Sequence, residues 1–440
     1  MVNVLIVGHG AREHVIGETL VKYGANLFAF MSFKNAGLED LSQGRIKTHS
    51  ETDFKEITNF CKTNKIDFVV IGPEAPLVVG IVDALEKNEI SCVGPRIEAA
   101  QLEGSKAFMR GLLEKYNVAS NVQSKQFKTM EGINEYLDKV GEENIVVKPD
   151  GLTGGKGVKV YGDHLFSRKD ILSYCEELVN SKSSFLLEEK CNGEEFTLQT
   201  FCDGKKVVGT PIVQDHKRAY ENDEGPNTGG MGSYSLEDHL MPFITKDDVD
   251  DALKDMESVI AAVKQETGVP YKGFLYGQFM KTKNGNKLIE FNSRFGDPEA
   301  MNVLPLLKTN FVDICYGIMD GNIQAQVQFE HKATVCKYLA PKGYPTSPLK
   351  DEPIIINHKK LQELGVKYYY ASVYRKNNET FTTSSRAMGI LGLANNLNEA
   401  EKVAEAGVHC IEGKLFHRKD VGTASLLQKR IEHMNSILKK

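Results

Sequence analysis

Residues Lys148 to Val158 read KPDGLTGGKGV, and this stretch decides the fold of the middle of the chain. It connects two short apolar strands that the sequence predicts at residues 145–148 and 158–161. Glycines let backbone N–H groups wrap around an anion, and lysines at both ends of the loop can add positive charge. The sequence lacks the Walker pattern G-x-x-x-x-G-K-[ST] but still predicts a phosphate-binding loop, with a flexible surface hairpin as the alternative. The residues that would contact the anion are Lys148, Gly151, Gly154, Gly155, Lys156 and Gly157.

The segments that follow this loop alternate with turn residues, as antiparallel strands do. Phe185 to Glu189 and Phe196 to Cys202 are two such strands. Residues 274–282 and 287–291 flank an Asn-Gly pair, which favours a β-hairpin. The polar stretch from Gln214 to Tyr234 has too many Gly, Asn and Asp residues for regular structure, and loops of this length are usually functional.

The first hundred residues have a different order of elements. Apolar strands at residues 2–7, 67–71 and 90–93 alternate with helical patterns at residues 12–23 and 77–87. This β-α-β-α-β order predicts an α/β fold with a doubly wound parallel sheet.

The length of 440 residues suggests about three domains. We expect an N-terminal α/β domain at residues 1–101, a central domain at 102–327 and a C-terminal mixed α+β domain at 328–440. A single helical pattern, residues 96–116, carries the chain from the first domain into the second.

The formal net charge of −5 is mild. It gives no footprint for a nucleic acid or an anionic membrane surface, so we expect neither partner. None of the 8 cysteines forms a C-x-x-C pair, which argues against zinc and thioredoxin-like sites. Met1 runs into the short apolar segment Val2 to Val7 without a basic region, and no stretch approaches the ~20 apolar residues of a membrane span. We expect a reduced, cytoplasmic protein.

The first strand is followed by the glycine turn GHGARE at residues 8–13. Glycines at this place bring a helix N-terminus close to a phosphate, but Glu13 occupies the third glycine position of the NAD fingerprint. Gly8 and Gly10 therefore predict a phosphate or sugar-phosphate site, against a tight turn without a ligand. Glu74 follows the next buried strand and is predicted to accept hydrogen bonds from sugar hydroxyls, unless it only complements a helix dipole.

The Asn-Gly hairpin predicts a metal site that depends on its register. A three-residue loop at 283–285, with Gly285 in the left-handed conformation, places Gln278 across from Glu290. Asn292 then shares a face with Glu290, because side chains alternate with period two. Such oxygen ligands suit magnesium carried by a nucleotide. A two-residue turn would shift the register and send Gln278 to the opposite face, which leaves an ordinary polar sheet as the alternative.

Two charged segments complete the set of candidates. Arg294 follows the hairpin directly, where an arginine beside a metal can stabilise negative charge on phosphoryl or acyl groups. Its alternative is an Arg–Asp surface pair of little energetic value. The acidic run from Glu188 to Glu195 is either part of the site or a solvated face.

Taken together and in this order, these segments resemble the ATP-grasp superfamily and, more closely, the phosphoribosylamine–glycine ligase family. The resemblance covers nearly the whole chain. It is carried by GPEAPL at 72–77, AAQLEGSKAF at 99–108, KPDGLTGGKGV at 148–158, QDHKR at 214–218, GPNTGGMG at 225–232 and IEFNSRFGDPE at 289–299.

The resemblance implies a ligase of de novo purine biosynthesis that joins glycine to 5-phosphoribosylamine through glycyl phosphate, giving glycinamide ribonucleotide, ADP and phosphate. Its cofactors would be ATP and Mg²⁺ or Mn²⁺, and its assembly a monomer or a small homo-oligomer. ATP would lie between two antiparallel-sheet subdomains of the central ATP-grasp domain, under a mobile lid at residues 120–190.

The same resemblance implies roles for individual residues. Lys106 and Lys148 would contact the ATP phosphates beneath the glycine loop, Glu188 would lie near the adenine edge, and Glu195 would bind the ribose. Arg294 and Lys148 would carry catalysis, and Asp215 would bind the glycine ammonium. The metal ligands would be Gln278, Glu290 and Asn292. The residues implied to hold the substrates are Gly8, Gly10, Asn35, Glu74, Asp215, Asn227, Thr228, Gly229, Arg294 and Asp297.

Three other functions are weighed against this one. The first is another ATP-grasp carboxylate–amine ligase, a carboxylase or a transformylase, and the second is a non-catalytic nucleotide-binding regulator. The third is an NAD-dependent dehydrogenase, and the incomplete glycine fingerprint argues against it. In the third domain, SSR at residues 384–386 stands where the family has Gly-Gly-Arg, and no role is assigned to this loop.

Overall fold

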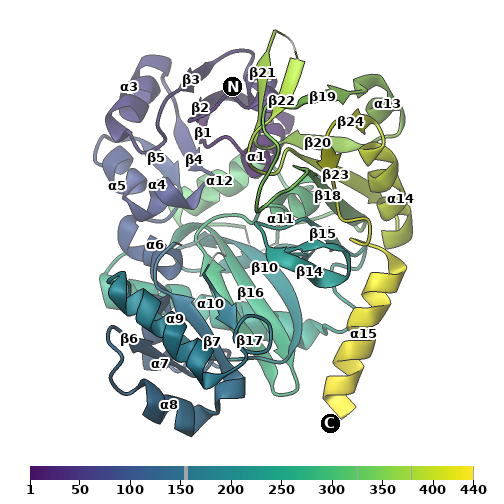
Figure 1. Ribbon diagram of the computed structural model, residues 1–440. Helices are drawn as coiled ribbons and strands as arrows, with labels where there is room; N and C mark the ends of the chain where they lie inside the picture. The colour runs from purple at the N-terminus through teal and green to yellow at the C-terminus, as the bar shows by residue number, and fades with distance from the viewer. Residues whose placement is uncertain (153–156, 325, 378, 440) are drawn as a thin grey trace.

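The computed structural model describes residues 1–152, 157–324, 326–377 and 379–439. The N-terminal unit contains β1 (Val2–Val7), α1 (Ala11–Lys22), β2 (Ala25–Met31), α2 (Ala36–Leu41), β3 (Ile46–Thr48), α3 (Phe54–Asn64), β4 (Phe68–Ile71), α4 (Glu74–Val78), α5 (Ile81–Glu86) and β5 (Ser91–Val93). Its five strands are parallel, in the order β3-β2-β1-β4-β5 (Figure 1). The predicted parallel sheet is confirmed.

This sheet is buried on both faces, which is why its strands are continuously apolar. Along β1, Val4 and Ile6 pack in the cluster that contains α1. Leu5 and Val7 point to the other face and pack in the cluster that contains α3 and α5.

The helical pattern after this sheet is two helices, not the single one predicted: α6 (Ile97–Gly104) and α7 (Lys106–Lys115). The break is at Ser105, whose backbone is extended and whose hydroxyl accepts a hydrogen bond from the Phe108 N–H at 3.1 Å. Serine is a favoured N-cap because it satisfies one of the free N–H groups of the first turn. The break makes Lys106 the first residue of α7.

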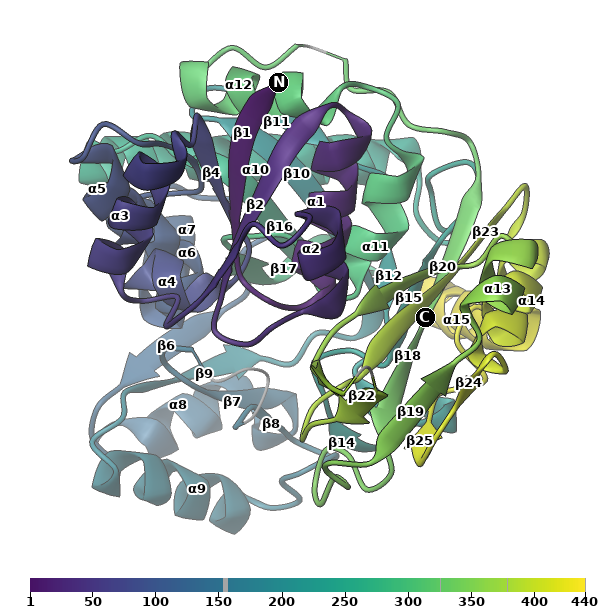
Figure 2. The ribbon, with the colours of Figure 1, turned by 90° about the horizontal axis from the view of Figure 1, so that it is seen from above.

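A small unit follows, made of β6 (Ser124–Phe127), α8 (Ile133–Val140), η1 (Glu142–Asn144), β7 (Ile145–Pro149), β8 (Lys159–Val160), α9 (Arg168–Asn180) and β9 (Phe185–Glu189). Its strands form an antiparallel sheet in the order β6-β9-β7-β8. Ile133 of α8 and Ile171 of α9 pack with Phe185 against one face. Figure 2 shows this unit set apart from the N-terminal sheet.

The central sheet is built from β10 (Gly193–Asp203), β11 (Val207–Gly209), β16 (Lys272–Thr282) and β17 (Gly285–Asn292), and α10 (Lys246–Thr267) lies between them in the sequence. The strands are antiparallel, in the order β11-β10-β16-β17. Met256 and Ile260 of α10 pack with Phe279 of β16 in one buried cluster. The middle of the chain therefore holds two separate antiparallel sheets.

The stretch from Gln214 to Tyr234 is more regular than predicted. It contains β12 (Gln214–Asp215), β13 (Arg218–Tyr220), η2 (Glu221–Asp223), β14 (Glu224–Asn227) and β15 (Gly232–Ser235). The polar composition does not reveal these strands because they are short. β12 pairs with β15, and β15 also pairs with β18 in a distant part of the chain.

β18 belongs to the C-terminal unit, which is reached through α11 (Glu299–Val303), η3 (Leu304–Leu306) and α12 (Phe311–Asp320). It contains β18 (Ala333–Pro341), β19 (Pro353–Ile356), α13 (His358–Glu363), β20 (Lys367–Tyr370), β21 (Val373–Lys376), β22 (Glu379–Thr382), β23 (Met388–Ala394), α14 (Leu397–Val408), β24 (Ile411–Glu412), β25 (Leu415–Phe416) and α15 (Ala424–Lys439). One sheet runs β12-β15-β18-β23-β20 with β25 beside β18, and the other runs β21-β22-β19-β24. This confirms the mixed α+β expectation. In the described residues, no helix combines the length and the apolar character needed to cross a membrane.

β16 and β17 pair in the predicted register, but the turn that connects them is not the predicted one. Gln278 lies opposite Glu290, as expected. However, Thr282 lies opposite Gly285, so two residues form the turn and the predicted three-residue loop is wrong. The missing step is restored by a β-bulge, in which Ile289 is the extra residue.

The bulge also frees a carbonyl group for the cleft. Leu288 and Phe291 both pack in the core although they are three residues apart, which a regular strand would not allow. Between them, the Ile289 carbonyl accepts hydrogen bonds from Arg110 Nη2 at 3.0 Å and Lys148 Nζ at 3.2 Å. The bulge thus connects the central sheet to α7 and to the small unit.

A deletion tests this account of the hairpin. Removing Ile289 should leave a folded protein, because the deletion makes the ladder regular and keeps Gln278 opposite Glu290. We expect the free energy of unfolding to fall by about 3 kcal/mol, since two charge-assisted hydrogen bonds are lost. Removing Met280 from β16, which pairs on both sides, should instead prevent folding. Urea unfolding followed by circular dichroism compares the two variants. An equal loss of stability in both would contradict the assignment of Ile289 as the bulged residue.

Candidate active site

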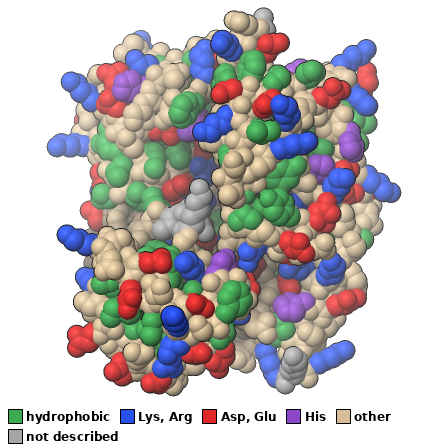
Figure 3. All heavy atoms as spheres, in the orientation of Figure 1, with side chains coloured by type: hydrophobic (Ala, Val, Ile, Leu, Met, Phe, Trp, Pro, Cys, Tyr) green, Lys and Arg blue, Asp and Glu red, His purple; other side chains and the backbone are tan. Residues whose placement is uncertain are grey.

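A cleft of about 720 Å³ lies where the N-terminal unit, the small unit, the central sheet and the C-terminal unit meet. Figure 3 shows a face of the molecule on which acidic and basic side chains surround a central hollow. The predicted site residues that line the cleft are Glu74, Lys106, Lys148, Gly151, Glu188, Glu195, Asp215, Asn227, Thr228, Gly229, Glu290, Asn292, Arg294 and Asp297. Gly154, Gly155 and Lys156 lie outside the described residues.

Glu188, at the end of β9, is buried between two cations. Arg110 of α7 binds it with two nitrogens, Nε to Oε1 at 2.9 Å and Nη2 to Oε2 at 3.0 Å. Lys148 Nζ lies 2.7 Å from Oε2. Burial alone would raise the pKa of Glu188, but Arg110 and Lys148 outweigh it and hold the pKa at about 2. The carboxylate is therefore ionised at neutral pH and fixes Lys148 at the wall of the cleft.

Lys106 stands beside the glycine loop. Its Nζ donates to the Gly151 carbonyl at 2.8 Å, and burial lowers its pKa. Asp150, just before the loop, accepts hydrogen bonds from Ser105 Oγ and the Ala107 N–H, both at 3.2 Å. The start of the loop is thus tied to the start of α7, and the two predicted phosphate-binding lysines line the same cleft.

The predicted metal ligands sit on the cleft side of β16 and β17. Lys217 Nζ contacts both Gln278 Oε1, at 2.5 Å, and Glu290 Oε1, at 3.5 Å. Burial would raise the pKa of Glu290, but Lys217 and other lysines lower it. A cation already lies between two of the ligands, so their oxygens converge on one point. Gln278 is 1% exposed and also donates to Glu195 Oε2.

The donor set is too weak to hold a metal ion alone. Within the described ranges, no three His, Cys, Asp or Glu side chains come together as a metal site. One carboxylate and two amides fit a magnesium ion that takes its remaining oxygens from a nucleotide. The assignment of Gln278, Glu290 and Asn292 as metal ligands stays a prediction.

Arg294 joins the N-terminal unit to the cleft. Its Nε lies 3.2 Å from Glu74 Oε2, and its Nη2 lies 3.1 Å from Glu103 Oε1. Glu103 also accepts the Ser293 N–H at 2.7 Å, and burial raises its pKa to about 7. Arg294 therefore does not form the exposed Arg–Asp surface pair of the alternative interpretation, because it is 16% exposed and bridges two carboxylates, Glu74 and Glu103.

The N-terminal glycine turn supplies its own anion. Glu13 Oε2 accepts the Gly10 N–H at 2.6 Å, at the start of α1. Gly8 has φ +121°, and a Cβ there would lie 2.6 Å from the Glu13 side chain. A carboxylate therefore occupies the place where the sequence suggested a phosphate, which favours the alternative of a turn without a ligand. Neither glycine lines the cleft.

Asn35 has a structural task. It is 1% exposed and forms the N-cap of α2, accepting the Gly37 and Leu38 N–H groups at 3.0 and 3.1 Å. Its Nδ2 donates to the Tyr370 carbonyl at 2.7 Å, which ties the C-terminal unit to the N-terminal one. Its implied substrate contact stays a prediction, with both ends of the amide already engaged.

The loop with Asn227, Thr228 and Gly229 packs on the segment that follows β12. The Thr228 hydroxyl donates to the Lys217 carbonyl at 2.8 Å and accepts the Gly230 N–H at 3.0 Å. These bonds fix the loop beside Asp215, which ends β12 and lines the same cleft.

The sequence did not assign roles to several residues of the cleft. Three of them lie inside segments that carried the resemblance: Glu103, Lys217 and Glu299. Arg386 also lines the cleft and belongs to the loop that departs from the family pattern, while Arg110 lies behind the wall and acts through Glu188. Only the folded chain brings these two to the site.

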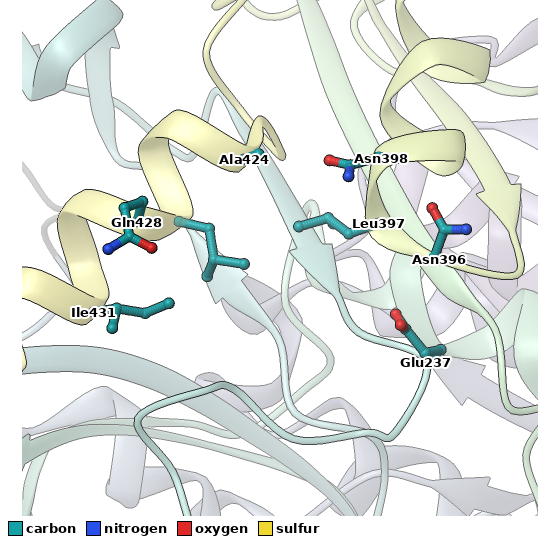
Figure 4. Close-up of a pocket in the computed structure, with 8 residues that line it drawn as sticks. Glu237, Asn396, Leu397, Asn398, Ala424, Gln428 and Ile431 are labelled. Atoms are coloured by element: carbon teal, nitrogen blue, oxygen red, sulfur yellow. The ribbon is translucent and has the colours of Figure 1, made fainter.

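A second pocket, of about 300 Å³, lies between the start of α14 and α15 (Figure 4). Among the residues that line it there is one carboxylate, Glu237, and no lysine or arginine. The rest are Asn396, Leu397, Asn398, Ala424, Leu427, Gln428 and Ile431. It offers no cation to bind a phosphate, so the cleft is the candidate site.

The buried triad predicts how stability depends on pH. Glu188→Gln should lower the free energy of unfolding at pH 7 by about 3–5 kcal/mol, because Arg110 and Lys148 lose a buried partner. The pKa of Glu188 is depressed in the folded state, so its contribution is complete above about pH 4.5 and is lost as the pH falls toward 2. The variant should therefore show a flatter decline in this range. Urea unfolding at several pH values measures it.

Glu131→Gln, at an exposed position of the small unit, is the matched control and should behave like the unaltered protein. The same acid sensitivity in the Glu188 variant would contradict the role of the triad.

Family models match most of the chain. The model of the phosphoribosylglycinamide synthetase N domain matches residues 2–103, that of its ATP-grasp (A) domain residues 104–300, and that of its C domain residues 334–424. Phosphoribosylamine–glycine ligase of Thermococcus gammatolerans is 48% identical over 438 residues, which cover 99% of this chain and 98% of the relative.

Solved structures agree with this match. Phosphoribosylamine–glycine ligase of Thermotoga maritima has a TM-score of 0.81 at 26% identity, over 95% of this chain and 100% of that one. A biotin carboxylase domain from Hydrogenobacter thermophilus, in complex with magnesium ADP, has a TM-score of 0.70 over 100% of this chain and 94% of that one, and at 13% identity shares the fold alone. The chain belongs to the phosphoribosylglycinamide synthetase family of ATP-grasp enzymes.

Proposed function

We propose that this chain uses ATP to join glycine to 5-phosphoribosylamine, giving glycinamide ribonucleotide, ADP and phosphate, in de novo purine biosynthesis. The observation that carries the proposal is one cleft lined by phosphate-binding lysines, oxygen ligands, a buried arginine and carboxylates. The identity of 48% over nearly the full length of a ligase named for this reaction supports it.

The nucleotide lies between the small unit and the central sheet. Lys106 and Lys148 bind its phosphates, and Glu188 acts by holding Lys148 in place. Glu195 lies at the ribose end. Gly151 lies at the start of the glycine-rich segment, with a left-handed φ of +89° that favours glycine. Gly157 is the last glycine of that segment, and its carbonyl accepts a hydrogen bond from the Tyr174 hydroxyl at 2.6 Å.

Gln278, Glu290 and Asn292 hold magnesium or manganese that arrives with the nucleotide. When bound, the ion neutralises charge on the phosphates during phosphoryl transfer. The oxygen donors fit such an ion, and Lys217 has to leave its place between Gln278 and Glu290 to admit it.

Arg294 binds the glycine carboxylate and orients it toward the γ-phosphate. Attack by a carboxylate oxygen releases ADP and forms glycyl phosphate. The amine of phosphoribosylamine then attacks the acyl carbon, and inorganic phosphate leaves. Asp215 binds the glycine ammonium. The chain needs no nucleophile of its own, because this chemistry depends on position and charge.

The acceptor, phosphoribosylamine, lies at the other end of the cleft. Glu74 reaches this region from the N-terminal unit, and the loop of Asn227, Thr228 and Gly229 reaches it from the central part of the chain. Asp297 completes this end. Gly8, Gly10 and Asn35 act indirectly. The glycine turn positions Glu13, and Asn35 caps the N-terminus of α2.

The test is ADP release from ATP and magnesium with glycine and freshly generated phosphoribosylamine, each omitted in turn. We expect release to require both substrates and to stop with EDTA. Glu290→Gln should abolish it, while Glu131→Gln leaves it unchanged. Release with glycine alone would leave the acceptor open and favour another ATP-grasp ligase or a transformylase. Tight ATP binding without any release would favour a regulator.

Arg386 of the C-terminal unit shapes the acceptor end. Its guanidinium lies 4.2 Å from the Tyr338 ring centroid. Its Nη1 donates to the carbonyls of Gly229, Gly230 and Asp297 at 2.9, 2.8 and 3.1 Å. One planar group therefore holds both loops of the acceptor end, which a lysine cannot reproduce.

Arg386→Lys should raise the KM for phosphoribosylamine by about 10-fold or more, because the carbonyls lose charge-assisted hydrogen bonds. The KM for ATP should change little, since the lysines that bind it are untouched. Steady-state kinetics measures both. Arg375→Lys, in an exposed pair with Asp40, is the matched control and should change neither. A loss of ATP affinity in the Arg386 variant would contradict a local role.

A further inference from the structure

Lys217 lies between two of the three proposed metal ligands. Its Nζ donates to Gln278 Oε1 at 2.5 Å and lies 3.5 Å from Glu290 Oε1. Among the described residues, it is the one cation that forms a salt bridge with Glu290. Burial lowers the pKa of Lys217, but Glu290, Glu195 and other carboxylates outweigh it and raise the pKa. A positive charge of the chain therefore stands where the ligand oxygens converge.

The contact with Lys217 also sets the orientation of the Gln278 amide. Its Oε1 accepts from Lys217, while its Nε2 donates to Glu195 Oε2. The amide oxygen therefore faces the ammonium, and this oxygen is the atom that a magnesium ion would need. Lys217 thus keeps Gln278 and Glu290 in the arrangement that a cation requires.

The backbone of Lys217 is fixed, so its side chain alone is free to leave. The Lys217 carbonyl accepts the Thr228 N–H at 2.7 Å and the Thr228 hydroxyl at 2.8 Å. The preceding residue, His216, donates its N–H to the Gly232 carbonyl at 2.9 Å and accepts the Met231 N–H at 2.8 Å. The side chain of Lys217 is 34% exposed and lines the cleft. Rotation about its side-chain bonds can move the ammonium without moving a strand.

A divalent ion without a nucleotide would meet a positive environment. Lys106, Lys148 and Lys217 all line the cleft, and the charge of each acts on Glu290. Glu290 is the one carboxylate among the proposed ligands, and like charges repel strongly in a partly buried site. A nucleotide changes this balance, because its phosphates compensate the lysines. The charges therefore favour entry of the ion together with the nucleotide.

We propose that Lys217 is an internal substitute for the metal ion, which keeps Gln278 and Glu290 together and excludes a free divalent ion until the nucleotide arrives. The inference rests on the proposed function and deepens it, because it gives an order of binding. When the phosphates enter, the ammonium turns from Gln278 and Glu290 toward them and leaves both oxygens to the ion. Lys217 is a positioning residue of the metal site, since it acts through the ligands.

The test is binding of Mn²⁺ to the nucleotide-free protein, measured by electron paramagnetic resonance, in which bound Mn²⁺ loses the sharp signal of the free ion. The unaltered protein should bind Mn²⁺ weakly. Lys217→Met keeps most of the side-chain length but removes the charge, and should tighten Mn²⁺ binding by about 10-fold or more. Lys217→Arg keeps the charge and should bind as weakly as the unaltered protein. A merely structural role predicts the opposite, because a damaged site binds less tightly.

Three further variants complete the test. Lys254→Met, in an exposed pair with Asp251 on α10, is the matched control and should leave Mn²⁺ binding unchanged. Glu290→Gln combined with Lys217→Met should remove the gain, because the ion loses its carboxylate. If Lys217→Met does not fold, Lys217→Gln takes its place, since it removes the charge and keeps a donor for Gln278.

Tight Mn²⁺ binding to the unaltered protein without a nucleotide would overturn the inference. Unchanged affinity in the folded, uncharged Lys217 variant would also overturn it, as would a gain that persists without Glu290. Each of these results leaves the proposed function standing if ADP release still requires both substrates. Absence of that release would instead overturn the proposed function.

Discussion

The structure depends on the pairing of one buried carboxylate. Glu188 would cost several kcal/mol in the interior without partners. Arg110 and Lys148 compensate it, and both also donate to the carbonyl that the Ile289 bulge leaves free. These contacts join α7, the small unit and the central sheet at one point. They determine how the two antiparallel sheets face each other, and hence where a nucleotide fits between them. A phosphate that binds Lys148 has to share it with Glu188.

Charge compensation differs from one end of the cleft to the other. Near the nucleotide lysines and under Arg294, each buried carboxylate has a cation from the chain. Around Asp215 and Glu299 the chain gives hydrogen-bond donors but no salt bridge within the described residues. The charge of Lys217 acts on both carboxylates from beyond salt-bridge distance and opposes the rise in pKa that burial causes.

The C-terminal unit takes part in building the cleft. Its main sheet is continued by β12 and β15, which carry Asp215 and lead into the acceptor loop. Arg386 stacks on Tyr338 and binds the carbonyls of that loop, while Tyr338 donates to Asp297 at 2.6 Å. Motions of this unit would therefore be felt directly at the acceptor end. The departure of its loop from the family pattern leaves the arginine, the functional part, in place.

The sequence by itself determined what local pattern can encode. Continuous apolar runs gave the parallel sheet, and the segments of the resemblance contain most residues that line the cleft. Other features came only with tertiary structure. The Ile289 bulge keeps the predicted register with a shorter turn than predicted. Glu13 accepts the Gly10 N–H at the turn where the sequence suggested a phosphate, and Asn35 caps a helix. Arg386 reaches the cleft from a loop that departs from the family pattern, and Arg110 supports its wall by pairing with Glu188. The physical reason is that partners of buried charges are chosen by packing between distant segments, and periodicity along the chain does not record them.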